Sequence, residues 1–253
     1  MQYLADTHMH SIYSYDGQMC LTDMIEKGIE LGLKYMAFTE HLEFSQITLK
    51  QFLNRYQVYS QEVDKLQEKY PEITLIKGVE FSNPDKYPHE LEEVNKLDLD
   101  YIIGSNHESP KDNSELEILK YYKNILDMVK LGGIDSLGHL DYLRRKYDDS
   151  LSNNDELRKM RDDLIREIYS YLIVSNIALE INSSAVRRCG LDSFPSEEKI
   201  QIYKELGGTK ITIGSDAHRL NEIYDAIPQI DRSYDLDKGI YLKREFISLS
   251  NKK

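Results

Sequence analysis

The sequence contains no tryptophan, and it has only two cysteines and six prolines among its 253 residues. Cys20 and Cys189 stand apart, whereas disulfide scaffolds and zinc-finger modules need several cysteines, commonly in closely spaced pairs. The sequence therefore argues against both kinds of module. We expect the two cysteines to be small buried hydrophobic side chains, and we expect the chain to work in a reducing compartment, the cytoplasm.

Long hydrophobic runs are also missing. No segment approaches the roughly 20 apolar residues of a membrane span, and the opening MQYLADTHMH lacks a basic stretch followed by an apolar one. We therefore expect neither a membrane span nor a signal peptide. The GxxxxGK[ST] loop of P-loop nucleotide enzymes and the GxSxG nucleophile elbow are absent as well.

Positive charge is scarce, because 32 lysines and arginines face 44 acidic residues, for a net charge of -12. An acidic protein repels phosphate backbones, so general binding to nucleic acid is disfavoured. A small anionic substrate would need local help from metal ions or a few arginines. The sequence does not determine the oligomeric state.

Short apolar runs alternate with longer amphipathic segments, which is typical of βα units around a mainly parallel sheet. We predict seven strands, at residues 3–7, 35–39, 74–81, 101–105, 136–139, 178–182 and 210–214. Helices are expected after the capping residues Thr22, Thr48 and Ser196, and over residues 114–131 and 154–175. The length suits one α/β barrel domain spanning residues 1–253. The tail after His218 is not assigned.

Polar residues gather at the carboxyl ends of the predicted strands. Six of the seven histidines follow or close an apolar run, in the company of acids: His8, His10, Glu40, His41, Glu80, His107, His139, Asp216 and His218. In a barrel of parallel strands these ends share one face, where such enzymes place their active sites. Imidazole and carboxylate groups are common metal ligands. The pattern predicts one metal site assembled from most of the chain.

Each motif has a simpler interpretation when it is considered alone. His8 and His10 could be a surface pair, Asp16 could start an Asp-Gly turn, and Glu80 could form a buried salt bridge. His107 or His139 could be a hydrogen-bonded core histidine, and Asp216 could cap a helix. Their repetition at equivalent strand ends favours the metal site. His89 breaks the pattern, and we expect it at the surface or behind the ligands.

The motifs DTHMHSIYSYDG, FTEH, GVEF, GSNH, GHLD and GSDAH resemble, in this order, those of the polymerase and histidinol phosphatase (PHP) superfamily. The resemblance spans nearly the whole chain. More narrowly, GHLDYLRRKY and LEINSSAVRR are similar to segments of the monofunctional histidinol-phosphate phosphatases. The resemblance implies a distorted (βα)7, TIM-like barrel with a centre of three divalent metal ions at the carboxyl face of its strands.

The resemblance also implies how the ligands are shared among the ions. The first ion would be held by His8, His10, Glu80 and Asp216, the second by Glu80, His107 and His139, and the third by Asp16, His41 and His218. Glu80 would bridge the first two. Many relatives have histidine where this chain has Asp16, so the third site is richer in hard oxygen ligands. Zinc, iron and manganese all suit such ligands.

The activity implied by the resemblance is metal-dependent hydrolysis of L-histidinol phosphate to L-histidinol and phosphate in histidine biosynthesis. Two cations can orient an attacking water and neutralise the phosphoryl oxygens. Glu80, Asp216 and His218 are the expected catalytic residues. The alternatives are another small phosphate ester or phosphotyrosine as substrate, and a noncatalytic metal-binding barrel. A polymerase-associated module ranks last, because the acidic chain shows no basic groove.

Substrate selection is expected from residues beside the ligands. Arginine grips phosphate with two parallel hydrogen bonds, and Arg145 and Arg187 follow the fifth and sixth predicted strands. Their neighbours Arg144 and Arg188 are equally placed alternatives, and a surface pairing with an acid is the simpler role for any of them. Contacts to the imidazole or amino group are expected from three further side chains, Glu43, Asn106 and Asn182.

Overall fold

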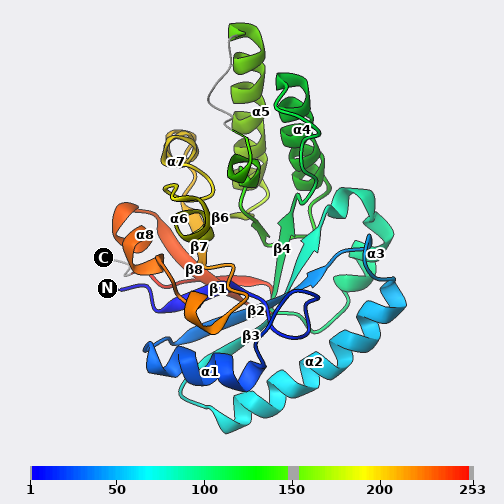
Figure 1. The fold of residues 1–253 in the computed structure, drawn as a ribbon, viewed down its shortest axis with the longest axis vertical. Coiled ribbons are helices and arrows are strands. Elements are labelled where there is room, and N and C mark those ends of the chain that lie inside the picture. The colour runs from blue at the N-terminus through cyan, green and yellow to red at the C-terminus, as the bar shows by residue number, and fades with distance from the viewer. Residues whose placement is uncertain (1, 148–153, 251–253) are drawn as a thin grey trace.

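The computed structural model describes residues 2–147 and 154–250, and its strands follow one another in chain order around a nine-stranded sheet (Figure 1). The strands are β1 (Ala5–Met9), β2 (Tyr35–Leu42), β3 (Thr74–Ser82), β4 (Tyr101–Ser105), β5 (Ser136–Leu137), β6 (Ala178–Asn182), β7 (Lys210–Gly214), β8 (Asp237–Leu242) and β9 (Glu245–Ser248). Strands β1 to β8 are parallel, and β9 returns antiparallel to β8. All seven predicted strands are present, and the unassigned tail supplies β8 and β9.

The two sides of the sheet meet between β7 and β1. At its start β7 pairs with β8, since Lys210 lies opposite Asp237. Just beyond the end of β7, the backbone N–H of Asp216 donates to His8 O at 2.8 Å, and that of His10 donates to Ala217 O at 2.9 Å. The strands therefore surround a common interior at their carboxyl ends, which is the expected distorted α/β barrel.

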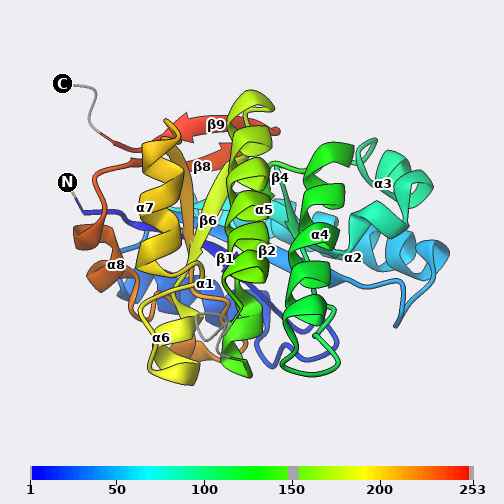
Figure 2. The ribbon, with the colours of Figure 1, turned by 90° about the horizontal axis from the view of Figure 1, so that it is seen from above.

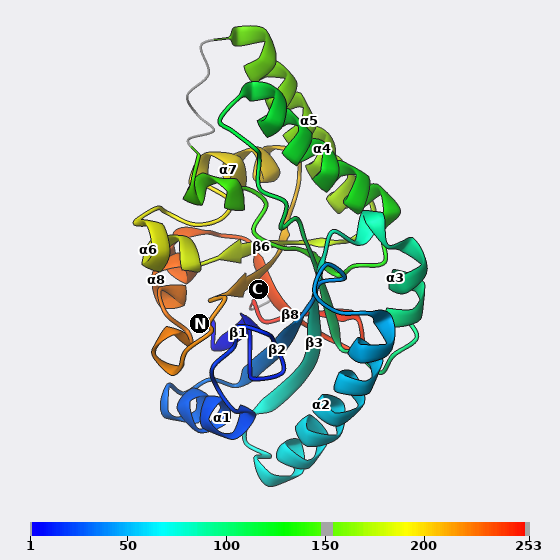
Figure 3. The same ribbon diagram turned by 45° about the vertical axis from the view of Figure 1, so that its right-hand side comes forward.

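Helices lie outside the strands, as Figure 3 shows. They are α1 (Leu21–Glu30), α2 (Leu49–Lys69), α3 (Pro88–Val94), α4 (Glu115–Leu131), α5 (Asp155–Val174), α6 (Ser184–Cys189), α7 (Glu197–Glu205) and α8 (Ile227–Ser233). Helices α4 and α5 pack side by side (Figure 2). Within the described ranges, three short 3-10 helices, η1 (Pro84–Lys86), η2 (Tyr142–Arg145) and η3 (Leu220–Glu222), follow β3, β5 and β7.

Helix capping follows the sequence at most starts. Thr48 and Gln51 form a capping box at α2, and the Ser196 hydroxyl caps α7. The prediction for Thr22 was wrong, because α1 begins at Leu21, two residues before the expected Asp23, and the Cys20 thiol accepts the N–H of Asp23. Both cysteines are only partly buried, contrary to expectation, since each lies at a helix end.

Tyrosine supplies much of the bulk that tryptophan would give. The largest fully buried side chains are Tyr59, Tyr101, Tyr122, Tyr169 and Tyr203. The hydroxyl of a buried tyrosine usually has a hydrogen-bond partner, and that of Tyr59 donates to Phe38 O at 2.7 Å, which ties α2 to β2.

Among the described residues, no helix combines the length and the apolar character needed to cross a membrane.

Candidate metal centre and pocket

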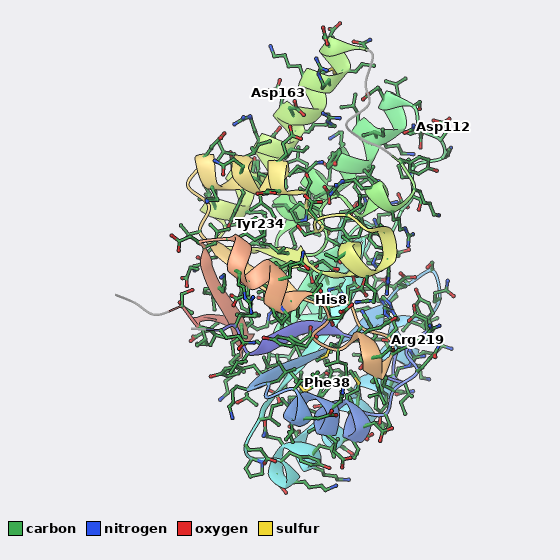
Figure 4. All side chains as sticks on the ribbon, turned by 60° about the vertical axis from the view of Figure 1, so that its left-hand side comes forward. His8, Phe38, Asp112, Asp163, Arg219 and Tyr234 are labelled. Carbon is green, nitrogen blue, oxygen red and sulfur yellow. The ribbon has the colours of Figure 1, made fainter. Side chains whose placement is uncertain are left out.

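The carboxyl ends of the strands surround a cavity of about 400 Å³. It is lined by Tyr15, Asp16, His41, Glu43, Glu80, His107, His139, Tyr142, Arg145, Arg188, Asp216 and His218. His8 and His10 are fully buried beneath this cavity, and Figure 4 shows His8 in the middle of the molecule, far from Asp163 on α5. The structure therefore brings together all nine side chains that were expected to bind metal.

The strands extend further than the sequence indicated. His8 lies within β1 and His41 within β2, whereas both were expected after their strands. The reason is that parallel pairing continues beyond the predicted strand ends: Met9 lies opposite Phe38 after an irregularity that contains His8, and His41 lies opposite Glu80. His107, Asp216 and His218 do follow their strands, as predicted, whereas His139, which was expected to close its strand, lies two residues beyond the end of β5.

Glu80 is the centre of the cluster, and its two oxygens face different groups of histidines. Oε1 lies 3.1 Å from His107 Nε2 and 2.9 Å from His139 Nε2. Oε2 lies 3.4 Å from His8 Nε2 and 3.6 Å from His10 Nε2. A carboxylate with its oxygens divided in this way has the geometry of a bridging ligand between two cations.

The first group of ligand atoms fits a small cation well. His8 Nε2 and His10 Nε2 are 3.1 Å apart, and Asp216 Oδ1 is 3.6 Å from His10 Nε2. Two ligands of a tetrahedral ion at 2.0–2.1 Å lie about 3.3 Å from each other. The opposite ring nitrogens already have partners, since His8 Nδ1 contacts Glu180 and His10 Nδ1 contacts Ser14. With a proton on each outer nitrogen, the two inner nitrogens direct their lone pairs at one point, which suits a cation.

The side chains of the other two expected groups also lie close together, but in the described part of the chain the atoms near enough to share one ion include neither His139 nor Asp16. Asp16 joins the third group through Oδ1 at 3.4 Å from His41 Nε2 and Oδ2 at 3.2 Å from His218 Nε2. Among the described residues, three sets of side chains have ligand atoms close enough to hold a metal ion: His8, His10 and Asp216; His41, Glu80 and His107; and His10, His41 and His218. The chain thus contains candidate metal-ligand clusters of histidine with aspartate or glutamate.

The charges of the cluster shift several pKa values in the metal-free protein. Burial lowers the pKa of His41, but Asp16 and Glu80 outweigh it and raise the value to about 10. For His107, burial is likewise outweighed by Glu80 and Glu43, which raise the pKa to about 9. Burial raises the pKa of the Glu80 carboxyl, but the facing histidines hold it well below its usual range. Protons on His41 and His107 therefore balance the carboxylates where metal ions are absent.

Binding of zinc to the metal-free protein at pH 7 should release protons, because His41 and His107 must give up a proton before they can coordinate an ion. Isothermal titration calorimetry in buffers of different ionisation enthalpy measures this number directly. The His89→Ala variant is the matched control, since His89 is exposed on α3, and it should release as many protons as the wild type. An observed heat that is independent of the buffer would contradict the expectation.

Of the arginines considered from the sequence, the structure brings Arg145 and Arg188 to the pocket. Arg188 donates to Asp216 Oδ2 at 3.2 Å and to Asp216 O at 3.1 Å. The Arg145 guanidinium lies 4.0 Å above the ring of Tyr142. Arg187, the sequence candidate, does not line the pocket, because successive residues of α6 point about 100° apart around the helix.

Arg187 and Arg144 instead hold neighbouring segments together. Arg187 donates to Ser215 O at 3.1 Å and faces the carboxylates of Glu222 and Asp225 at 3.6 Å. Arg144 donates to Ser193 O at 3.0 Å. Both therefore have the simpler role of pairing with groups of the protein.

Of the other three side chains that were expected to contact the substrate, one lines the pocket and two do not. Glu43 lines the pocket and also accepts a hydrogen bond from His107 Nδ1 at 2.5 Å. Asn106 is buried between Asn83 and Tyr121, and its amide bonds to both. Asn182 is fully buried and bonds to Ser184 and Glu180. The structure therefore does not bring either asparagine to the pocket, since its amide is used within the protein.

Three residues of the site were missed from the sequence, and a fourth, Glu40, was noted there without an assigned role. Tyr15 and Tyr142 line the pocket, but nothing distinguishes them among 19 tyrosines. Glu40 accepts hydrogen bonds from both Ser11 and Ser14 below the ligands. Glu180 interrupts the buried strand β6, and this carboxylate in an apolar run is the same signal that identified Glu80.

Comparisons with known proteins agree with the geometry. The family model of the PHP domain matches residues 6–184. A probable histidinol-phosphatase of Thermotoga maritima is 29% identical over 251 residues, which cover 99% of this chain and 97% of that protein. A histidinol-phosphatase of Lactococcus lactis is 30% identical over 230 residues, with 84% and 83% covered.

Among solved structures, the chain is similar in fold to histidinol phosphate phosphatase from Lactococcus lactis, which was crystallised with zinc, L-histidinol and phosphate. The TM-score is 0.75 at 21% sequence identity, and the match covers 97% of this chain and 99% of the other.

Proposed function

Because this chain belongs to the PHP domain family, we propose that it is a metal-dependent phosphomonoesterase that hydrolyses L-histidinol phosphate to L-histidinol and phosphate. The observation that carries this proposal is the position of Glu80, whose two oxygens face separate groups of histidines at the floor of an arginine-lined pocket. The names of both full-length relatives support the choice of substrate.

We propose that the centre would hold three divalent ions, zinc, iron or manganese, and that Glu80 would serve two of them. When bound, such ions supply Lewis acidity and activate water for attack on phosphorus. The nine side chains fit this role, because their nitrogens and oxygens converge, and the outer ring nitrogens of His8, His10 and His107 already have hydrogen-bond partners. Asp16 gives the third group more oxygen character.

The protein's own side chains position the phosphate. Arg188 and Arg145 place two guanidinium groups on the pocket wall, and each can offer parallel N–H donors to phosphoryl oxygens. Asp216 accepts a hydrogen bond from Arg188 and thereby couples the phosphate clamp to a metal ligand. Asp216 and His218 lie beside this clamp, and we assign to them the side of the site where the leaving alkoxide takes up its proton.

Glu43 and Tyr15 supply the features that suit an amino alcohol rather than a neutral sugar. The Glu43 carboxylate and the Tyr15 ring line the same pocket as the arginines. Tyr15 stacks on His41 with ring centroids 5.0 Å apart, which presents an aromatic surface at the pocket rim. A carboxylate and an aromatic ring favour a cationic, planar leaving group such as histidinol.

The test is phosphate release from L-histidinol phosphate compared with a panel of other phosphomonoesters and phosphodiesters. The protein is reconstituted with zinc, iron or manganese and assayed with and without chelator. A metal-dependent preference for histidinol phosphate is the expected result. A greater kcat/KM for phosphotyrosine or a sugar phosphate would overturn the substrate, and no hydrolysis with any metal would overturn the enzyme assignment.

Replacing Arg188 by alanine should lower kcat/KM by about 10- to 100-fold, mainly through KM, because a hydrogen bond to a charged group contributes about 1.5–3 kcal/mol. Inorganic phosphate should inhibit the variant correspondingly less well. Arg187→Ala is the matched comparison on the same helix, and it should lower the unfolding temperature and leave phosphate inhibition intact. Unchanged KM and phosphate inhibition in Arg188→Ala would move the clamp to Arg145.

A further inference from the structure

Glu180 is a fully buried carboxylate on β6, and its oxygens contact two different histidines of the site. Oε1 lies 2.5 Å from His8 Nδ1. Oε2 accepts the backbone N–H of His139 at 2.8 Å and the side-chain amide of Asn182 at 3.3 Å. Glu180 does not line the pocket, so it does not contact a substrate.

The contact with His8 determines which ring nitrogen faces the site. A carboxylate at Nδ1 requires a proton there, so the lone pair of the neutral ring is on Nε2. That atom is the one that lies 3.1 Å from His10 Nε2 and 3.4 Å from Glu80 Oε2. Glu180 therefore orients His8 toward the first group of ligands.

The contact with His139 acts through the backbone. Strand β5 has only two residues and ends at Leu137, so the segment that carries His139 has few ladder hydrogen bonds of its own. The hydrogen bond from His139 N to Glu180 fixes this segment where His139 Nε2 reaches Glu80 Oε1 at 2.9 Å. His139 Nδ1 is buried without a hydrogen-bond partner, so its ring has no such support.

We propose that Glu180 is a positioning residue that prepares two metal positions at once, one through the ring of His8 and one through the backbone of His139. The inference rests on the metal centre of the proposed function and adds the residue that couples its two sides. Removal of Glu180 should therefore weaken the binding of two ions together, although Glu180 ligates neither.

Glu43 provides the contrast within the same site. Its Oε1 contacts His107 Nδ1 at 2.5 Å, and its other partner is the hydroxyl of Ser82. Among the histidines of the described residues, Glu43 therefore supports one ring, where Glu180 supports a ring and a backbone segment. Glu43→Gln should weaken the binding of one ion, and Glu180→Gln should weaken the binding of two.

Glutamine is an informative replacement at position 180, because the N–H groups of His8 and His139 both need a hydrogen-bond acceptor there. The amide has one carbonyl oxygen and one NH2 group. Whichever way it is turned, either His8 Nδ1–H or His139 N–H faces another donor, and the contact that remains loses the charge of the carboxylate and is weaker, so both metal positions are affected. The volume is unchanged, so no cavity is created. Aspartate keeps both acceptors but is shorter by one methylene group, and it should give a weaker version of the same effect.

The experiment is a competition between the metal-free protein and a chromophoric chelator for zinc, with bound metal counted by mass spectrometry. For Glu180→Gln we expect two of the zinc dissociation constants to rise by about 10- to 100-fold, the usual effect of losing such a partner. For Glu43→Gln we expect one to rise. Asp135→Asn is the control for loss of a buried carboxylate, since Asp135 bonds to Ile102 and Arg244 away from the pocket, and its zinc affinities should match the wild type.

Zinc affinities that are unchanged in Glu180→Gln, or a loss at one site alone, would overturn the inference. Failure of the wild type to bind zinc would instead overturn the proposed function. If Glu180→Gln does not fold, nitrogen-15 spectra of the zinc-loaded wild type give a second test. They should show a proton on His8 Nδ1 and zinc on Nε2, and zinc on Nδ1 would contradict the proposed contact.

Discussion

Glu80→Gln should lower turnover by about 10³-fold or more while the barrel stays folded. Glu80 is buried at 1% exposure with histidine nitrogens on both of its oxygens. The substitution keeps the shape but removes the charge, and it replaces one acceptor with an NH2 group that cannot face a cation. Both groups of ligands that share Glu80 are affected, so the loss should exceed that of any substitution at the pocket rim.

Steady-state phosphate release with metal-replete protein measures this effect, and circular dichroism checks the fold. Glu40→Gln is the matched control, because Glu40 is also buried on β2 but bonds to the serines of the following loop. The control should lose much less activity. Near-normal turnover in Glu80→Gln, or an equal loss in both variants, would remove Glu80 from its bridging position.

The strands that carry the site could be predicted because their sequences have a clear pattern. Buried parallel strands are apolar throughout, so a histidine or carboxylate at the end of one is conspicuous. The hairpin of β8 and β9 could not be found in this way. Its turn places Lys243 and Arg244 at φ of 50° and 66°. Asparagine or glycine usually occupies such positions in a hairpin turn, so lysine and arginine did not indicate a turn here.

Within the site, the types of residue could be predicted, but the directions in which their side chains point could not. Ligand histidines converge because the barrel fixes the strand ends. For Arg187 and Arg188 the choice depends on the rotation of α6, which only the packing of that short helix determines. Asn106 and Asn182 follow or close strands exactly as the ligands do, but their amides bond to nearby protein groups. A sequence pattern does not distinguish an amide used in this way from one that faces a ligand.

Removing the metal ions should abolish turnover, and returning zinc, iron or manganese should restore it. Chelator-treated protein with bound metal below the detection limit is the sample, and phosphate release is the measurement. Apart from the contacts made by the two arginines, everything that the site does to the phosphate depends on the ions. The expected loss of turnover is therefore complete. Retained turnover in a demonstrably metal-free sample would contradict the metal-dependent mechanism.

The stability gained from metal should grow as the pH rises from about 6.5 to 9. In the metal-free protein the pKa of His41 is raised to about 10 and that of His107 to about 9, compared with about 6.5 in the unfolded chain. Their contribution is complete below pH 6.5 and is lost as the pH rises through these values, because the folded state then binds more protons than the unfolded one. The metal-bound protein needs no such protons. Thermal unfolding with and without metal should therefore show a widening difference in Tm, and a constant or narrowing one would mean that protons and metal ions do not compete for these histidines.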